Sequence, residues 1–147
     1  MADVFSKEKR SWIMGRVKGR DTRPEIIVRS FVHRMGYRFR IHHRELPGNP
    51  DIVLPRHGKA IFVHGCFWHG HKQCPRSKRP ATNRGFWNTK LDGNVGRDER
   101  CRRALRRIGW KVLVVWECET RDPKKLLRKL ARFLHEERRT ESQARRS

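Results

Sequence analysis

The chain has 147 residues, of which 35% are hydrophobic, enough for the core of one small domain but too few for two. Lys and Arg number 37 against 15 Asp and Glu, so the net charge is +22 and a polyanion such as nucleic acid is the expected partner. No apolar run approaches the roughly 20 residues that cross a bilayer, and no secretory signal opens the chain, so we exclude a membrane span and expect a cytoplasmic protein.

The first predicted element is a helix that follows a basic segment. Residues 1–20 carry little pattern, and they fit an arm, a short helix or a floppy tail. Thr22 suits the N-cap of a helix, Glu25 suits its capping-box acid, and Gly36 suits its end. Apolar residues recur between them at helical spacing, at Ile27, Val28, Phe31, Val32 and Met35.

Strands are predicted next along the chain. Residues 37–42 alternate with period two, which is typical of a half-buried strand. Residues 51–54 and 59–64 predict two further strands separated by turn residues, and we expect them to form a hairpin. Residues 65–87 have no periodicity, which predicts a long irregular loop of the kind that is usually functional or held by a metal.

The remaining elements alternate helix and strand. Residues 88–108 predict a helix, and the nearly continuous apolar run 111–116 predicts a central strand that is buried on both faces and parallel to a neighbour. Residues 124–137 predict a last amphipathic helix, and 138–147 predict a disordered basic tail. The fold class is therefore α/β, with a single domain over residues 21–137 built as a mixed β-sheet flanked by helices.

Thiol and imidazole groups cluster in and after the irregular loop. Three potential ligands lie within nine residues and a fourth follows the predicted strand 111–116, namely Cys66, His71, Cys74 and Cys118. Free thiols with a solvated histidine are the alternative interpretation, but four such donors suit tetrahedral zinc, and a loop without a core of its own needs an anchor. Cys101 lies on the apolar stripe of a helix and is expected in the core.

A second group combines carboxylates with imidazoles, namely Glu25, Asp51, His64, His69 and Asp98. Asp98 points inward from an apolar helix stripe, so it needs a cation, a histidine or a metal as its partner. These groups suit phosphodiester hydrolysis, which uses carboxylate-held Mg²⁺ and proton transfer by histidine near neutral pH. Each residue also has a simpler interpretation. Asp51 fits a turn, His64 fits packing, Asp98 fits a pair with arginine, and for Glu25 the sequence alone favours a helix cap.

Large aromatic residues mark the same loop, namely Phe67, Trp68, Phe86 and Trp87. In a basic loop without regular periodicity they suit stacking on bases or insertion between base pairs. A small core around the zinc is the alternative interpretation, and we expect it for Phe86. Trp110 and Trp116, which flank or lie on the predicted strand 111–116, are expected in the core.

These residues together resemble the very short patch repair DNA mismatch endonuclease family. The resemblance covers about residues 1–137 and rests on Asp21-Thr22 with Glu25, Pro50-Asp51, Phe62 through His71, Phe86-Trp87, Asn94, Arg97-Asp98 and Trp110 through Cys118. It implies a type II restriction endonuclease-like fold. It also implies an enzyme that nicks one DNA strand beside the thymine of a T:G mismatch, the product of 5-methylcytosine deamination. Restriction-type relatives carry a carboxylate-x-Lys motif where this chain has Phe62-Val63-His64, a departure that the mismatch family shares.

The resemblance also implies roles for individual residues. Asp51 and the main-chain carbonyl of Val63 would hold catalytic Mg²⁺, and structural Zn²⁺ would be held by Cys66, His71, Cys74 and Cys118. His64 with Asp98, and His69 with Glu25, would form imidazole–carboxylate pairs. Three aromatic side chains would insert into the base stack from the major groove, namely Phe67, Trp68 and Trp87. Met14 would insert from the minor groove.

The expected partner is double-stranded DNA with a T:G mismatch, and other mismatch-repair proteins are further expected partners. We expect the protein to act as a monomer at the nucleoid in the bacterial cytoplasm. One alternative is a restriction-type or structure-specific endonuclease without mismatch preference. Another is a zinc-containing DNA-binding module without catalysis, which the inward Asp98 and the paired histidines argue against.

Overall fold

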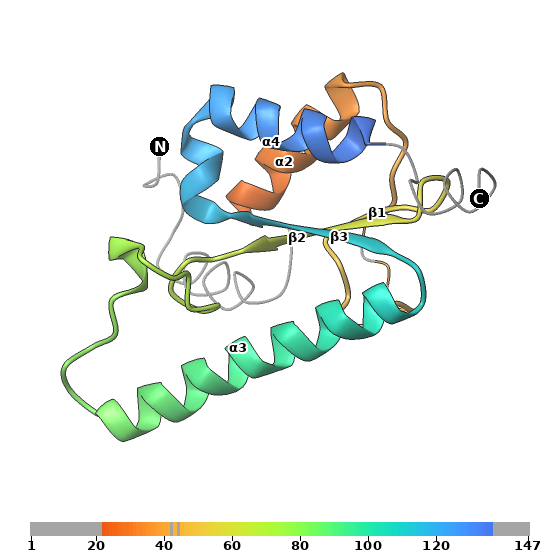
Figure 1. Cartoon of the computed structure of the whole chain (residues 1–147). Coiled ribbons are helices and arrows are strands. Elements are labelled where there is room, and N and C mark those ends of the chain that lie inside the picture. The colour runs from red at the N-terminus through yellow and green to blue at the C-terminus, as the bar shows by residue number, and fades with distance from the viewer. Residues whose placement is uncertain (1–21, 42, 44, 137–147) are drawn as a thin grey trace, which may run out of the picture.

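A three-stranded mixed sheet forms the middle layer of the computed structural model, which describes residues 22–41, 43 and 45–136. Its strands are β1 (Ile52–Leu54), β2 (Lys59–His64) and β3 (Lys111–Trp116), in the order β1-β2-β3. β1 and β2 form the predicted antiparallel hairpin, and β2 and β3 run parallel. The sheet lies between α2 and α4 on one face and α3 on the other (Figure 1).

The helices α2 (Arg23–Arg34) and α4 (Pro123–His135) cover one face of the sheet. α2 begins as predicted, because the Thr22 hydroxyl accepts a hydrogen bond from the Glu25 amide at 3.5 Å. In α4 the Asp122 side chain caps the amide of Lys125 in the same way, at 3.2 Å. Both caps fix the direction in which an amphipathic helix leaves the loop before it.

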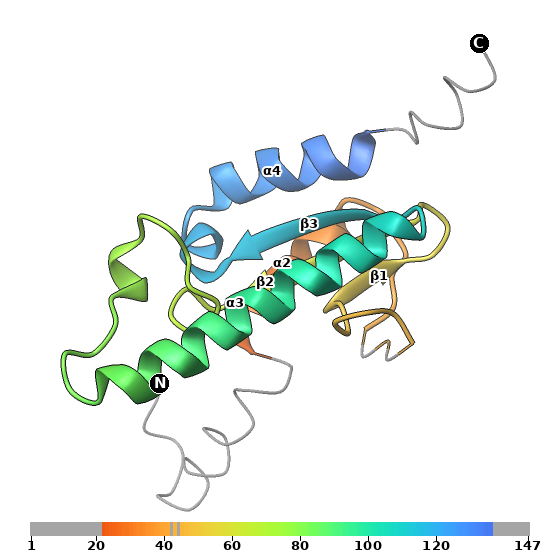
Figure 2. The ribbon, with the colours of Figure 1, turned by 60° about the horizontal axis from the view of Figure 1, so that its bottom comes forward.

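The long helix α3 (Arg84–Arg107) covers the other face. Its first turns project beyond the strand ends, beside the loop that follows β2 (Figure 2). A short 3-10 helix, η2 (Pro75–Ser77), lies in that loop. A second one, η3 (Glu117–Arg121), follows β3 directly. None of the helices that the structure describes is long and apolar enough to cross a membrane.

Two apolar clusters follow from the alternation of side chains along β2. Ile61 and Val63 point to the α2 and α4 face, where they pack with residues of both helices, such as Val28 and Leu130. Ala60 and Phe62 point to the α3 face and pack with Leu105. Because His64 continues this second series, its side chain also faces α3.

Three of the predicted elements differ from the structure. The described part of the predicted strand 37–42, residues 37–41, forms no named strand and makes an isolated antiparallel bridge from Arg40 to Val53 of the short strand β1. The strand 111–116 is parallel to its neighbour as expected, but it lies at an edge of the described sheet while the fully buried β2 is central. The expected burial on both faces is also wrong, because Val115 is buried and the other five residues of the strand are half-buried. The helix predicted over 88–108 begins earlier, at Arg84.

Candidate active site

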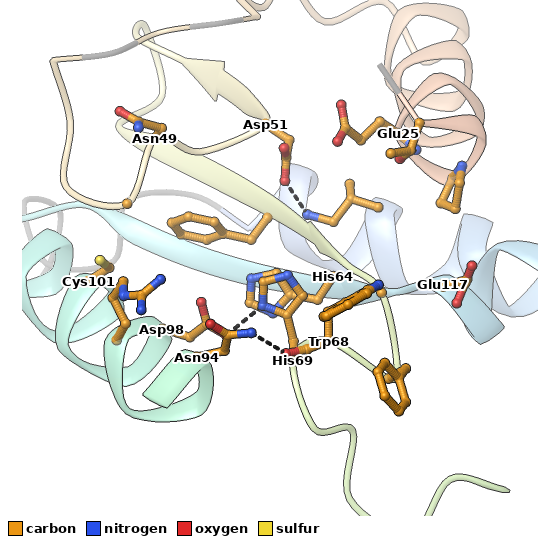
Figure 3. Close-up of a pocket in the computed structure, with 18 of the residues that line it drawn as sticks. Glu25, Asn49, Asp51, His64, Trp68, His69, Asn94, Asp98, Cys101 and Glu117 are labelled. Carbon is orange, nitrogen blue, oxygen red and sulfur yellow. Dashed lines mark hydrogen bonds and ion pairs between the residues drawn. The ribbon is translucent and has the colours of Figure 1, made fainter. Parts of the chain in front are cut away.

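A cavity of about 840 Å³ opens at the end of β2 and collects the acidic and imidazole residues that the sequence singled out. Its lining includes Glu25, Asp51, His64, His69 and Asp98, which come from α2, the loop before β1, the end of β2, the following turn and α3 (Figure 3). Five different segments therefore converge on one site.

His64 and His69 form a stacked pair on the α3 side of the cavity. Their ring centroids are 3.9 Å apart and their planes differ by 7°. His64 is only 4% exposed, and its Nδ1 has no hydrogen-bond partner among the described residues. Burial, with a smaller contribution from His69, lowers the pKa of His64 to about 3, so this ring is neutral at physiological pH.

Asp98 pairs with His69, at 2.6 Å between its Oδ2 and the ring Nδ1. The expected pairs of His64 with Asp98 and of His69 with Glu25 are therefore wrong. The turn after β2, closed by a bond from the His69 amide to the Gly65 carbonyl, carries His69 toward α3 and away from α2, where Glu25 lies. The inward direction that the sequence predicted for Asp98 is confirmed, because its side chain is 20% exposed and faces the cavity.

The Asp51 carboxylate lies at the edge of β2 on the β1 side, where its Oδ2 accepts a hydrogen bond from the Val63 amide at 2.6 Å. Burial and the neighbouring Glu25 carboxyl group raise the pKa of Asp51 to about 7. Glu25 itself is buried and forms an ion pair with Arg29 at 3.1 Å. The cavity thus holds two carboxyl groups on one side of the strand end and two imidazoles with a carboxylate on the other.

The loop before Asp51 is held against α3 by a close backbone approach. Gly48 has φ of +78°, and a Cβ built on it would lie 2.7 Å from the Cβ of Cys101. Cys101 is half-buried and lines the cavity wall, which corrects its expected place in the core. The approach requires a residue without a side chain at position 48.

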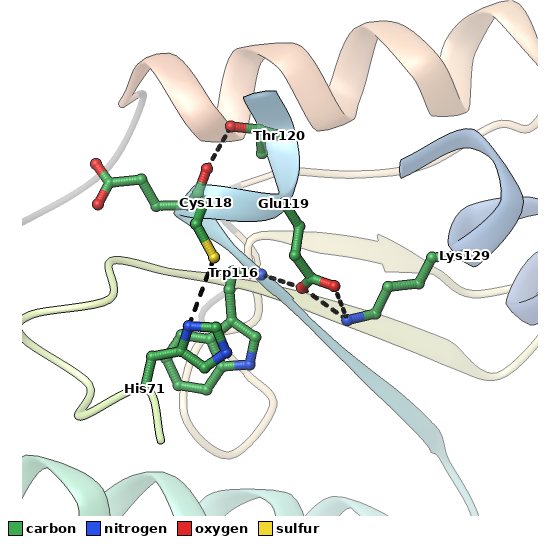
Figure 4. Close-up of polar contacts among 7 residues, drawn as sticks. His71, Trp116, Cys118, Glu119, Thr120 and Lys129 are labelled. Atoms are coloured by element: carbon green, nitrogen blue, oxygen red, sulfur yellow. Dashed lines mark hydrogen bonds and ion pairs between the residues drawn. The ribbon is translucent and has the colours of Figure 1, made fainter. Parts of the chain in front are cut away.

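The four expected zinc ligands converge beside this cavity. Cys66, His71, Cys74 and Cys118 each offer a donor atom, and these atoms all lie within 4.8 Å of one another. Figure 4 shows the Sγ of Cys118 directed at the Nδ1 of His71, at 3.5 Å. Burial raises the pKa of the Cys66 thiol. A divalent cation would allow the thiols to ionise, and three sulfurs with one imidazole nitrogen are the donors of structural zinc sites, so the cluster is consistent with structural zinc.

Trp116 connects this thiol cluster to the histidine pair. His71 stacks on its ring with centroids 4.2 Å apart, and His64 meets its edge at 5.3 Å. Sequence reasoning assigned Trp116 to the core and missed this contact. The sequence contained a signal for this contact. Trp116 is the last residue of the strand beside β2, and like His64 it ends an alternating series of side chains that face α3.

Aromatic rings of the loop and of α3 form one cluster at the cavity mouth. Phe67 lies 5.1 Å from Trp68 and 5.5 Å from Trp87, between ring centroids. Phe86 is 60% exposed, so its expected place in a small core around the zinc is wrong. Its ring instead contacts Trp87 and the Lys90 ammonium. Met14, the arm over 1–20 and the tail over 138–147 lie outside the described residues.

Further cavity residues come from α3. Asn94 lies about one turn before Asp98 and Lys90 about two turns before it, and Asn94 donates a hydrogen bond to the Trp68 carbonyl at 3.0 Å. The residue-by-residue argument gave neither of them a role. Their spacing of four residues from one another and from Asp98 was the available signal, because it places all three on one helix face.

The family model and the relatives in sequence agree on one family. The family model described as DNA mismatch endonuclease Vsr matches residues 2–76. A type II nicking enzyme, V.XorIIP of Xanthomonas oryzae pv. oryzae, is 48% identical over 83% of this chain and 89% of its own length. The DNA mismatch endonuclease Vsr of Escherichia coli K12 is 44% identical over 86% of this chain and 80% of its own length. Among solved structures, the catalytic domain of the homing endonuclease I-Bth0305I matches with a TM-score of 0.55 and 25% identity, over 77% of this chain and 94% of that one.

Proposed function

Because this chain belongs to the family of the DNA mismatch endonuclease Vsr and is a DNA-nicking endonuclease, we propose that it cuts one strand beside the thymine of a T:G mismatch. Such mismatches arise when 5-methylcytosine is deaminated. The observation that carries the proposal is one cavity at the end of β2 in which paired carboxyl groups and paired imidazoles meet half-buried aromatic rings.

The carboxylate side of the cavity fits a magnesium ion. Asp51, which is half-buried, and Glu25, which is buried, place two carboxyl groups together, and ionised groups of like charge repel each other unless a cation lies between them. In an extended strand the amide and carbonyl of one residue point to the same side, so the Val63 carbonyl is directed toward the edge where its amide meets Asp51. Asp51 and this carbonyl would hold Mg²⁺, which supplies neutralisation of the charge that develops on phosphate oxygens.

The imidazole side fits proton transfer. Asp98 accepts the Nδ1 proton of His69, which leaves the Nε2 lone pair available to take a proton from the attacking water. His64 stays neutral because it is buried, and its stacked ring fixes the orientation of His69. We therefore assign His69 as the general base, Asp98 as the residue that orients it, and His64 as the support of both.

The aromatic cluster supports selectivity for a mismatch. A T:G pair stacks poorly, so inserting Phe67, Trp68 and Trp87 into that step costs less than insertion at a matched pair. The Lys90 ammonium, 5.9 Å from the centroid of the Trp68 ring, adds positive charge at the same mouth. Met14 would act from the opposite groove, as the family resemblance implies.

Zinc would hold the loop that carries the aromatic rings. Two of its ligands, Cys66 and His71, flank Phe67, Trp68 and His69 in the chain, and Cys118 lies on η3 after β3. A metal bound to all four side chains would fix this loop on the sheet. The strong positive charge fits a double-stranded DNA partner along a longer stretch of duplex.

Nicking of a labelled duplex in the presence of Mg²⁺ tests the proposal. We expect one strand of a T:G duplex to be cut beside the thymine much faster than either strand of the C:G duplex of the same sequence. Equal rates would favour a nicking enzyme without mismatch preference, a candidate supported by relatives named type II nicking enzymes. Binding without any cleavage would instead favour a DNA-binding module.

A further inference from the structure

The indole ring of Trp116 contacts both the thiol cluster and the histidine pair. The His71 ring stacks on it with centroids 4.2 Å apart and planes 10° apart, and the His64 ring meets it edge to face at 5.3 Å. His71 belongs to the thiol cluster, and His64 lines the catalytic cavity. We propose that Trp116 is a positioning residue for both sites, because one side chain orients a metal ligand and also the histidine that supports His69.

The backbone at Trp116 is itself held in place. Trp116 is the last residue of β3 and lies opposite His64 in the parallel pair with β2. Its amide donates a hydrogen bond to the Glu119 carboxylate at 2.8 Å, and the Lys129 ammonium of α4 donates to both oxygens of that carboxylate (Figure 4). The indole ring therefore projects from a fixed Cα position, as a positioning role requires.

On the metal side, Trp116 sets the plane of the His71 ring. The His71 Nδ1 lies 3.5 Å from the Cys118 Sγ, so this nitrogen is the donor atom that faces the thiols. The lone pair of an imidazole nitrogen lies in the ring plane, so a tilt of the ring turns it away from an ion. Metal-binding histidines are ordinarily oriented by a further contact of the ring, and loss of that contact weakens metal binding. The stack on Trp116 provides such a contact.

On the catalytic side, Trp116 acts on His69 through His64. The His64 ring contacts both of its neighbours, and its stack on His69 has centroids 3.9 Å apart. His64 is 4% exposed, so packing against these neighbours keeps its ring in place. Loss of the indole would leave space into which His64 can turn, and His69 would lose its support. This half of the proposal rests on the proposed role of His69, and the metal half does not.

Two substitutions at position 116 test both halves. Trp116→Leu removes the aromatic ring, and Trp116→Phe keeps one. Zinc affinity is measured by competition with a chromophoric chelator, and DNA affinity by fluorescence anisotropy. Nicking is measured in single turnovers at saturating Zn²⁺ and Mg²⁺, on whichever duplex the wild type cuts. A wild type without T:G preference would therefore count against the proposed function and not against this inference.

We expect Trp116→Leu to lower zinc affinity about 3- to 10-fold, which is the size of one aromatic contact. At saturating zinc it should still nick about 10- to 100-fold more slowly, because a small displacement of the reacting groups costs rate. DNA affinity should change little, and Trp116→Phe should recover most of both losses. A general loss of stability would not lower the rate without lowering DNA affinity, and another ring would not restore it.

Trp110→Leu is the matched control. Trp110 is half-buried just before β3, at the far end of that strand, and packs against the cluster of Phe62 and Leu105. This variant should lose stability but keep its zinc affinity and its nicking rate, measured well below its denaturation midpoint. Unchanged zinc affinity or unchanged nicking in Trp116→Leu, equal losses in Trp116→Phe, or the same losses in Trp110→Leu would each overturn the proposal. If Trp116→Leu does not fold, Trp116→Met, whose longer flexible side chain fills more of the space, carries the same expectations.

Discussion

A polar side chain is buried at each end of β2, and the two side chains differ in their hydrogen bonding. At the start of the strand Lys59 is 2% exposed, and its ammonium donates to the carbonyls of Phe133, Leu134 and Glu136 at the end of α4. At the other end His64 is 4% exposed, and its Nδ1 has no hydrogen-bond partner within the described part of the chain.

The difference separates stability from function along a single strand. A helix C-terminus has free carbonyls and a negative dipole end, so the Lys59 ammonium satisfies both and fixes α4 to the sheet. The His64 end instead gathers carboxyl and imidazole groups whose mutual contacts leave atoms available for a substrate or ion. Substitutions at the two ends should therefore affect different measurements.

The largest expected effect is loss of activity at the cavity end. Asp51→Asn should lower the rate of T:G nicking by about 10³-fold or more, because a metal-holding carboxylate supplies several kcal/mol of transition-state stabilisation. DNA affinity, measured by fluorescence anisotropy, should change little. Glu99→Gln removes an exposed acid of α3 and serves as the control. Nicking by Asp51→Asn at the wild-type rate would remove Asp51 from the site.

The next effect is loss of stability at the Lys59 end. Lys59→Met should lower the free energy of unfolding by about 2–4 kcal/mol, because buried carbonyls at the end of α4 lose their charged donor. Urea denaturation measures this change. Nicking well below the melting temperature should be retained, and Lys124→Met, at an exposed lysine of the same helix, should be neutral. If Lys59→Met abolished nicking in a fully folded protein, the separation of the two ends would fail.

Much of this arrangement could be predicted from the sequence, because it depends on local signals. The cap at Thr22, the hairpin of β1 and β2, and the convergence of Cys66 with Cys118 follow from turn chemistry, periodicity and ligand spacing. The cluster at the end of β2 was also predicted as a set. These features need only short-range patterns, with the exception of Cys118, for which the chemistry of zinc supplies the long-range constraint.

The remaining features depend on how segments distant in the sequence are oriented toward one another, which a local sequence pattern does not specify. Whether Asp98 pairs with His64 or His69 is decided by how the turn at Gly65 crosses the end of β2. The contact of Trp116 with two histidines depends on the register of β3 against β2. The exposure of Phe86 depends on how far α3 extends beyond the sheet. Each is a long-range geometric outcome.

A smaller effect concerns selectivity at the cavity mouth. Trp68→Ala should reduce the ratio of T:G to C:G nicking rates by about 10- to 100-fold, since stacking of an aromatic ring on a base contributes about 1–3 kcal/mol. Single-turnover nicking of both duplexes measures the ratio. Ile108→Ala, at an exposed apolar residue beyond the other end of α3, should leave it unchanged. An unaltered ratio in Trp68→Ala would separate this ring from mismatch selection.

The smallest effect is a pH dependence of stability that belongs to the cavity end alone. The pKa of Asp51 is raised from 3.8 to about 7, so in Mg²⁺-free buffer the folded state holds a proton that the unfolded state has released. This contribution to the free energy of unfolding is fully present below about pH 4 and is lost progressively as pH rises from there through 7. Asp51→Asn should lack it, so denaturation midpoints of the variant should decline less between pH 4 and pH 8. Parallel curves for the two proteins would contradict the raised pKa.

The close approach of Gly48 to Cys101 has a consequence for how this protein can diverge. Any side chain at position 48 would collide with the Cβ of Cys101 on α3, and only glycine at position 101 would remove that atom, which would still leave the positive φ of +78° at position 48. Neither single changes nor compensating pairs at these two positions offer an easy route to a new loop. Diversity in this part of the molecule is therefore expected to arise by replacing the whole segment before Asp51, as in loop grafting, and not by stepwise substitution.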